Sequence, residues 1–482
     1  MEPAGSTFFW SFAFFVLAAP LYRGGNRALP LLALELAAIG FLLALALRRY
    51  RGAVLPPLPR LVIAALAVLL VYPLLQLVPL PESLWRALPG HAGYAAVAEG
   101  FAAPGAEGAR RAISLVPAAT EYGWLAMLPP LAALLAVRAL APAQVVTLLA
   151  AMTILAGLQG LVGLLQVAGG EDSFLHLGDA RTYGTATGTF VNRNHLAAML
   201  AMMLPVVVGL LLYRARHGRH GGLRLDASAS NVLSQRALVF ASAALILLCL
   251  LFTRSRAGIA TALMGLVFSS ILFVRARSGS RHAKPIVVAL VVTGIALAAL
   301  IGLTPLLERL EPGQLRLSGE GRLALYAATL RGAIEFLPFG SGLSTYASVF
   351  PRFQEGVGGA YYDFAHNDYL QLVMETGIAG AVAVALLLVA YLMRMADLVI
   401  RGSERSFTLL QVAAGVGLAP LILHSAFDFS LHMPGIAVWF ATLAGAMLHP
   451  GVRDAARDSA GGRRRSPGDS RREDAGADEA AP

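Results

Sequence analysis

Long uncharged stretches set the pattern of this sequence. Residues 237–252, ALVFASAALILLCLLF, hold no charged side chain, whereas a membrane β-strand would alternate apolar and polar residues. A helix of about 20 apolar residues crosses a bilayer core. The pattern therefore predicts an all-α integral membrane protein with about 12 transmembrane helices. The expected spans are residues 6–22, 28–47, 61–80, 122–140, 144–168, 194–213, 236–253, 257–274, 285–304, 367–393, 407–427 and 433–449.

Two long polar segments interrupt the spans, at residues 81–121 and 305–366. The second precedes the tenth expected helix and contains an amphipathic stretch, Arg322 to Phe336, for which we predict a helix lying on the membrane surface. The apolar positions of this helix are Leu323, Tyr326, Leu330 and Ile334. The stretch that follows, LPFGSGLSTY, is rich in turn residues and is suited to bring backbone amides close to a ligand.

Composition and charge add an orientation to this picture. Hydrophobic residues make up 57% of the chain, charged residues make up 14%, and the mean hydropathy is +0.67, which is too apolar for an ordinary globular surface. Lys and Arg concentrate in alternate short connections, such as residues 48–60, 214–236 and 275–284. This bias predicts that both termini are cytoplasmic and that the two long segments are periplasmic. The net charge of +10 is therefore interpreted as topology and attraction to anionic membrane lipids, without a nucleic-acid partner.

The two ends of the chain differ in character. The first apolar run follows MEPAGSTFFW, which lacks the basic start of a signal peptide, so we expect a retained helix. Residues 451–482 mix charges of both signs with small residues and hold no aromatic side chain. We therefore expect a polytopic membrane domain over residues 1–450 and a disordered cytoplasmic tail over residues 451–482.

Several kinds of chemistry lack the residues that they need. The single cysteine, Cys249, lies inside an expected span and has no second cysteine with which to form a disulfide. No Cys or His cluster has the spacing of a zinc site, and no glycine-rich loop carries the Lys and Ser or Thr of a phosphate-binding loop. We accordingly expect no metal, no cofactor and no nucleotide-driven transport.

Positive and polar side chains lie where expected spans meet the periplasm. Arg254 and Arg256 occupy a very short connection in TRSRAG, Arg193 and Asn194 open the sixth expected span, and Arg322 lies in the long segment before the tenth. Guanidinium groups offer paired donors that suit phosphate oxygens, and a helix start favours anions. The alternatives are arginines whose side chains extend to the membrane surface, a helix cap at Asn192 or Asn194, and a solvated face around Arg322.

His366 stands directly before the tenth expected helix. The positive end of a helix disfavours an imidazolium, so we expect a neutral imidazole that can act as a general base. In the alternative interpretation, Asn367 or Asp368 caps the helix and His366 is an ordinary interfacial residue. Glu375 follows about two turns later, where a carboxylate needs a partner or a cavity that the sequence does not identify.

These residues carry a family resemblance. The stretch HNDYLQLVMETGIAG resembles the signature of the bacterial O-antigen ligase and polymerase superfamily, in which His and Asn, Ser or Gln precede nine residues, a Gly, two residues and a small residue. His366, Asn367, Gly377 and Gly380 match it. TRSRAG, GRLALYAATLRGAIEFLPFGSGLSTY and HSAFDFSLHMP extend the similarity, in the same order, over about residues 152–450.

The resemblance implies a function. Members of this superfamily are inner-membrane enzymes that move a glycan from an undecaprenyl-diphosphate carrier to an acceptor hydroxyl at the periplasmic face. It implies that His366 acts as the base or positions the acceptor, that Arg256 and Arg322 are the essential arginines, and that no metal takes part. Direct displacement would invert the anomeric carbon. Arg193, Asn194 and Arg254 are supporting candidates for the diphosphate and glycan site, together with Asn367.

The sequence leaves two questions open: which acceptor receives the glycan, and whether the protein is an enzyme or a transporter. The acceptor is lipid A core for a ligase, another lipid-linked repeat for a polymerase, and Ser or Thr side chains for a protein glycosyltransferase. The rival is a transporter of lipid-linked saccharides or another amphiphile, which would place polar or broken-helix sites near the midplane of the bilayer. Here the conspicuous polar residues cluster at helix ends, which favours an enzyme.

Overall fold

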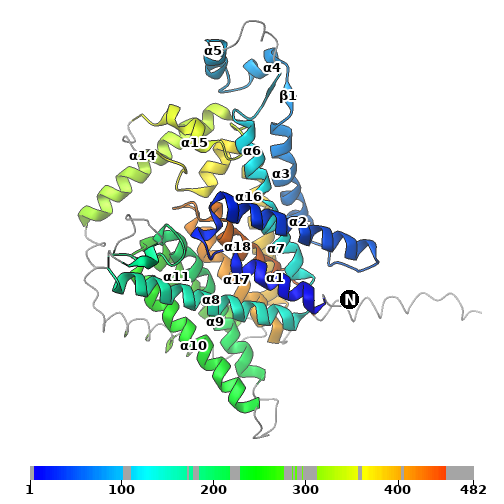
Figure 1. Cartoon of the computed structure of the whole chain (residues 1–482), viewed down its shortest axis with the longest axis vertical. Coiled ribbons are helices and arrows are strands. Elements are labelled where there is room, and N and C mark those ends of the chain that lie inside the picture. Colours follow the sequence, from blue (N-terminus) through cyan, green and yellow to red (C-terminus); the bar gives the residue numbers. More distant parts are fainter. Residues whose placement is uncertain are drawn as a thin grey trace, which may run out of the picture.

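The computed structural model describes residues 5–100, 110–170, 173–176, 184–217, 228–275, 312–355, 361–402 and 406–451, with isolated positions at 285, 288, 289, 292 and 296. Helices make up almost all of its regular structure (Figure 1). They are α1 (Ser6–Ala18), η1 (Arg23–Gly25), α2 (Ala28–Tyr50), α3 (Arg60–Gln76), α4 (Glu82–Ala87), α5 (Ala92–Gly100), α6 (Pro117–Leu125), α7 (Leu128–Arg138), α8 (Pro142–Ala168), η2 (Phe174–His176), α9 (Arg193–His217), α10 (Ser228–Phe252), α11 (Arg256–Arg275), α14 (Pro312–Phe336), α15 (Tyr346–Val349), η5 (Phe350–Phe353), α16 (Asp368–Ile400), α17 (Ser406–His424), η6 (Ser430–His432) and α18 (Pro434–Met447). Two short strands, β1 (Pro79–Leu80) and β2 (Arg111–Ala112), pair antiparallel.

Seven helices of the described chain are long and apolar enough to cross a membrane. They span Ala28–Tyr50, Pro117–Arg138, Pro142–Ala168, Arg193–Arg214, Arg256–Phe273, Asp368–Ile400 and Ser406–His424. Four shorter apolar helices cover Ser6–Ala18, Arg60–Gln76, Ala237–Phe252 and Pro434–Met447. Every expected span except the ninth overlaps one of these helices. The ninth, residues 285–304, falls almost wholly outside the described residues, as does the tail after Gly451, so the count of about 12 and the disordered tail stay predictions.

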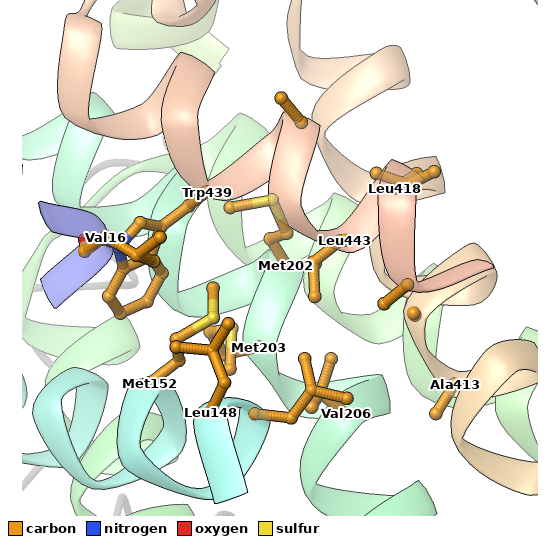
Figure 2. Close-up of a cluster of buried hydrophobic side chains, with 14 of the residues drawn as sticks. Val16, Leu148, Met152, Met202, Met203, Val206, Ala413, Leu418, Trp439 and Leu443 are labelled. Carbon is orange, nitrogen blue, oxygen red and sulfur yellow. Dashed lines mark hydrogen bonds between the residues drawn. The ribbon is translucent and has the colours of Figure 1, made fainter. Parts of the chain in front are cut away.

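The centre of the bundle is built from α9 and α17, the two most buried of these helices. Figure 2 shows Met202, Met203 and Val206 of α9 packed among side chains from α8 and α18. Trp439 of α18 is fully buried and its indole N–H donates to the carbonyl oxygen of Val16 at 2.9 Å, which ties α18 to α1. Such a continuous apolar core is what a membrane-embedded bundle needs, because its helices associate through close packing.

A second, smaller hydrophobic cluster lies at the end of the molecule that carries α4, α5, α14 and α15 (Figure 1). Its core is formed mainly by α14, α15, η5 and the start of α16. Tyr94 and Leu115, from the first long segment, pack against it. Backbone bonds also join the two segments, because Leu115 N donates to Ser341 O at 2.9 Å. The described parts of the expected loops at 81–121 and 305–366 therefore pack together beside the bundle.

The amphipathic stretch from Arg322 to Phe336 is helical, as predicted, but its packed face is a different one. Leu325, Ala328, Ala333 and Phe336 are buried in the second cluster. Of the residues proposed as the apolar face, Leu323, Leu330 and Ile334 are 67%, 49% and 61% exposed, whereas Tyr326 is half-buried and bonds to His366 O. Because α14 carries apolar side chains on both faces, one face packs in the second cluster while the other stays exposed, and the position of this helix on the membrane surface stays a prediction.

Candidate active site

His366 lies at the entrance of α16 with a backbone φ of 51°, a conformation that is uncommon for residues other than glycine. Neighbouring groups hold this geometry. The Tyr326 hydroxyl donates to the carbonyl oxygen of His366 at 2.8 Å, and the ring of Phe429 packs edge-on against the imidazole at 4.8 Å between centroids. The next residue, Asn367, caps α16, because its side-chain oxygen accepts the Leu370 N–H at 3.0 Å. The capping alternative is thus correct for Asn367.

The imidazole of His366 is paired with a buried carboxylate. Its Nδ1 lies 3.1 Å from Oδ1 of Asp428, whose side chain is only 1% exposed, while the His366 side chain is 31% exposed. Burial opposes the ionisation of Asp428, but the hydrogen bond from His366 and the nearby imidazoles outweigh it, so the pKa of Asp428 lies well below its usual range. An ionised Asp428 accepts a hydrogen bond from the Nδ1–H of His366. Nε2 of His366 is then the nitrogen that can take up a proton.

A second histidine–aspartate pair, His432 and Asp368, joins the same two segments of the chain. Nδ1 of His432 is 2.7 Å from Oδ1 of Asp368, and Asp368 Oδ2 accepts the Leu431 N–H at 3.2 Å. Asp368 N also donates to Ser425 O at 2.8 Å. These bonds attach the start of α16 to the loop between α17 and α18. The loop that carries Asp428 is thereby held in register with His366.

Glu375 has partners that the sequence did not identify. Its carboxylate accepts the backbone N–H groups of Ser344 at 2.8 Å and Tyr346 at 3.2 Å, and the side-chain amide of Gln371 at 3.1 Å. The carboxylate therefore anchors the turn-rich loop LPFGSGLSTY against α16. Its role in this structure is to organise the fold behind the site.

A steric constraint explains the glycine at position 377 of the signature. Gly377 interrupts α16 with φ 61° and ψ −142°, a region that is essentially restricted to glycine. A Cβ at this position would collide with the carbonyl oxygen of Pro338, which accepts the Ile378 N–H at 3.0 Å. The loop before α15 is thus inserted into the interruption of α16. The close approach that Gly377 permits is therefore that of a loop, and its own backbone conformation also requires glycine.

Arg322 is the predicted cation with a described link to His366, through Tyr326. It precedes Tyr326 by one turn of α14, and its charge acts on both Tyr326 and His424. Tyr326 in turn donates to His366 O.

The other predicted residues cluster around the starts of α9 and α11. Arg193 and Asn194 open α9, where the side chain of Asn192 accepts the Asn194 N–H at 2.8 Å, so the helix cap is Asn192. His195 packs edge-on against Phe429 at 4.7 Å between centroids, on the same ring that His366 contacts.

Arg254 lies in the connection between α10 and α11, which is as short as predicted, and Arg256 begins α11. Arg254 has a φ of 52°, and its Nε is buried without a hydrogen-bond partner in the described chain. A Cβ at Gly258 would collide with Ala197 of α9, so the starts of α11 and α9 are adjacent. His195, next to Asn194, links these helix starts to the Phe429 ring that His366 contacts.

An apolar groove of about 600 Å³ opens beside this cluster. It lies between α14 and α16 and reaches the cap residue Asn367 at one end. Its walls are Leu323, Tyr326, Ala327, Leu330, Asn367, Tyr369, Leu370 and Val373. A groove of this composition suits a hydrocarbon chain, and its residues Tyr326 and Asn367 connect it to His366.

Within the ranges that the structure describes, no group of three or more His, Cys, Asp or Glu side chains is arranged to hold a metal ion. The absence of a metal from the reaction stays a prediction. What the described site contains is a histidine whose Nδ1 lies 3.1 Å from a buried carboxylate, beside the capping residue Asn367 and an apolar groove. A histidine held in this way is chemically suited to remove a proton from a hydroxyl group.

Comparison with known proteins agrees with the motifs. Residues 241–385 match the family model described as O-antigen ligase, and this match supports membership of the chain in the O-antigen ligase and polymerase family. No curated protein matches the chain. The match also supports a glycan-transferring role in polysaccharide assembly. The matched segment contains Arg254, Arg256, Arg322, His366 and Asn367, and it ends before Asp428.

Asp428 was not singled out from the sequence. It stands within HSAFDFSLHMP, which was noted for its similarity as a whole, in a short connection that holds His424, Asp428 and His432 between two apolar spans. Titratable residues concentrated between spans were the available signal. The motif did not say which of them faces His366.

Proposed function

We propose that the protein is a glycosyltransferase that moves a glycan from an undecaprenyl-diphosphate carrier to an acceptor hydroxyl at the periplasmic face of the bacterial inner membrane. The observation that carries this proposal is the His366–Asp428 pair, with its 3.1 Å contact at the entrance of α16. The family match supplies the reaction class. The periplasmic orientation rests on the distribution of positive charges between the spans.

The proposed reaction is a direct displacement. Nε2 of His366 accepts the proton of the acceptor hydroxyl while the oxygen attacks the anomeric carbon of the glycan. The bond from that carbon to the carrier's diphosphate oxygen breaks, and the diphosphate leaves with the electron pair. Asp428 stabilises the imidazolium that forms. Inversion at the anomeric carbon follows from a single displacement, and the reaction uses no metal.

The leaving diphosphate gathers negative charge, which the nearby arginines are suited to stabilise. Arg322 is the first candidate, because its charge already acts on Tyr326 and His424 beside the imidazole. Arg193 and Asn194 open α9, Arg256 opens α11, and Arg254 lies just before α11; these two helix starts are adjacent. We propose that these residues hold the diphosphate and the first sugar.

We further propose that the groove between α14 and α16 receives the hydrocarbon chain of a lipid-linked substrate. Its walls are apolar, it reaches Asn367, and the outer face of α14 exposes Leu323 and Leu330. A lipid chain in this groove would lead its head group to His366. The acceptor is lipid A core for a ligase or a second lipid-linked glycan for a polymerase, and membrane lipids surround the bundle.

The test is a reaction with defined components. Purified protein in liposomes receives undecaprenyl-diphosphate-linked glycan together with either lipid A core or further lipid-linked glycan. The proposal expects a new glycosidic bond of inverted configuration, and the product that forms identifies the acceptor. If the glycan crosses the bilayer and no bond forms, the protein is a transporter and the proposal is wrong.

A further inference from the structure

His424 is a buried histidine directly behind the catalytic pair. It ends α17, its side chain is 0% exposed, and in the described part of the chain neither of its ring nitrogens has a hydrogen-bond partner. Oδ2 of Asp428 is also buried without a partner there. These two unsatisfied groups lie near each other, with Nε2 of His424 4.0 Å from Oδ2 of Asp428.

The carboxylate of Asp428 has one occupied and one unoccupied oxygen. Oδ1 lies 3.1 Å from Nδ1 of His366 and accepts the Phe429 N–H at 2.9 Å. Oδ2 is the remaining acceptor. A buried acceptor and a buried donor cost free energy when they stay unpaired, so both groups gain when the gap closes to hydrogen-bond length.

The backbone keeps the two groups in the same turn. Asp428 N donates to the carbonyl oxygen of His424 at 3.1 Å, and Phe427 N donates to the same oxygen at 2.8 Å. The side chains therefore need only small rotations to meet. Catalytic hydrogen bonds are often long in an enzyme without substrate and shorten when the substrate binds.

We propose that His424 is a positioning residue, whose Nε2–H donates to Oδ2 of Asp428 and holds that carboxylate between two imidazoles. This inference rests on the proposed function, since it assigns His424 a part in the same transfer. The acceptor proton still goes to Nε2 of His366, and no proton passes through Asp428 or His424. The added bond fixes the carboxylate so that His366 keeps its Nε2 directed to the acceptor.

Several charged groups face His424 and enter its pH dependence. Asp428, Asp368 and Arg322 of α14 act electrostatically on its ring. His195 of α9 lies within electrostatic range of the same cluster. A change of protonation at any of them shifts the behaviour of the His366–Asp428 pair, so each variant is compared with the wild type over the whole pH range.

Two serines are alternative candidates for the group that donates to Oδ2 of Asp428. The hydroxyl groups of Ser425 and Ser430 are also buried and unpaired within the described residues, and a hydroxyl can rotate to donate to a carboxylate. Ser425→Ala and Ser430→Ala are therefore matched controls. The inference expects both to retain the rate of the wild type.

The decisive comparison uses two amides. Gln places its side-chain nitrogen near the position of Nε2 and Asn places it near Nδ1, so His424→Gln keeps the donor and His424→Asn does not. We expect His424→Gln to transfer glycan within about threefold of the wild type, and His424→Asn to lose about tenfold or more in kcat with little change in KM. Without the hydrogen bond from His424, the Asp428 carboxylate accepts more strongly from His366 and stabilises its protonated form. The acid limb of the pH–rate profile therefore moves to higher pH in His424→Asn alone.

Wild type and His366→Ala are measured beside these variants. Transfer by the wild type with equal rates and unmoved acid limbs in His424→Gln and His424→Asn would overturn the inference and leave the proposed function intact. Loss of rate in Ser425→Ala or Ser430→Ala with full activity in His424→Asn assigns the donor to a serine and also overturns it. If the wild type forms no glycosidic bond, the proposed function itself is wrong.

Discussion

Asp428 and His366 are 62 residues apart in the chain, yet their side chains meet at 3.1 Å. The contact joins the loop after α17 to the entrance of α16 and gives the histidine a fixed tautomer. An asparagine at position 428 would keep the size but lose the charge that stabilises the imidazolium. We predict that Asp428→Asn lowers kcat for glycan transfer by about 10²- to 10⁴-fold.

The control for this variant is Asp363→Asn. Asp363 is an exposed aspartate on the approach to His366, so its replacement removes the same charge without touching the pair. Steady-state rates with the lipid-linked donor check both variants. Equal activity in Asp428→Asn and wild type would show that the carboxylate does not orient the base.

The depressed pKa of Asp428 predicts a pH dependence of stability. A carboxylate whose folded-state pKa lies below its unfolded value contributes stability that is present above the unfolded pKa and is lost as pH falls through the folded one. The unfolded value is about 3.9, so this contribution is full at neutral pH and declines only below about pH 4. We expect the Tm of the wild type in detergent to fall more steeply below pH 4 than that of Asp428→Asn. Parallel curves for the two proteins would contradict the prediction.

Arg322 is expected to stabilise the leaving diphosphate. Because the charge of Arg322 acts on the residues around His366, we predict that Arg322→Ala lowers kcat/KM for the lipid-linked donor by about 10²- to 10³-fold. Arg331→Ala is the control on the same helix, since Arg331 Nη2 donates to Phe353 O at 3.3 Å, away from the imidazole. Similar losses in both variants would mean that Arg322 acts through the overall positive charge of α14 or through folding, and that it does not stabilise the leaving diphosphate.

The groove between α14 and α16 predicts a dependence on lipid length. Leu330 lines the groove, and Leu330→Asp is expected to raise KM for a donor with a full undecaprenyl chain while affecting a short-chain donor less. Ile334→Asp is the matched control, because Ile334 is 61% exposed on the same helix and does not line the groove. If both variants raise KM equally, the effect comes from the surface of α14 and the groove has no part in it.

Gly377 tests the structural side of the signature. A side chain at φ 61° and ψ −142° is strained by about 1–3 kcal/mol, and its Cβ would also collide with Pro338 O. We predict that Gly377→Ala lowers the Tm measurably, whereas Gly40→Ala does not, because a Cβ at Gly40 would meet no other atom within 4 Å. Thermal unfolding in detergent measures both. An unchanged Tm in Gly377→Ala would mean that the interruption of α16 is not needed.

Most of the helices could be predicted from the local pattern of apolar residues. An apolar run of about 20 residues specifies a helix whatever packs around it, which is why the expected spans coincide with described helices. The start of α16 was also predictable, since Asn367 is a favoured capping residue directly before an apolar run. Spans whose helices break or end early, such as α3 ending at Gln76 before β1, depend on contacts that pattern does not contain.

The site was predictable only in part. His366 stood out because a polar group beside an apolar run needs a reason, whereas Arg322 was singled out through the family resemblance. The sequence did not identify Asp428 as the partner of His366. Contacts between segments far apart in the chain depend on the fold, and Asp428 lies in the connection after α17. The packed face of α14 was missed for a similar reason. Its sequence offers two apolar stripes, and the one with small residues, Ala328 and Ala333, fits against the second cluster.

The central claim is that His366 is the base of a glycan transfer. The most direct measurement is the single-turnover rate of glycosidic bond formation by wild type and His366→Ala in liposomes, with the donor prebound and the folded state of each protein checked by thermal unfolding. The account predicts that His366→Ala folds, binds the donor and forms product at least about 10²-fold more slowly. Product formation at the rate of the wild type by folded His366→Ala would contradict it.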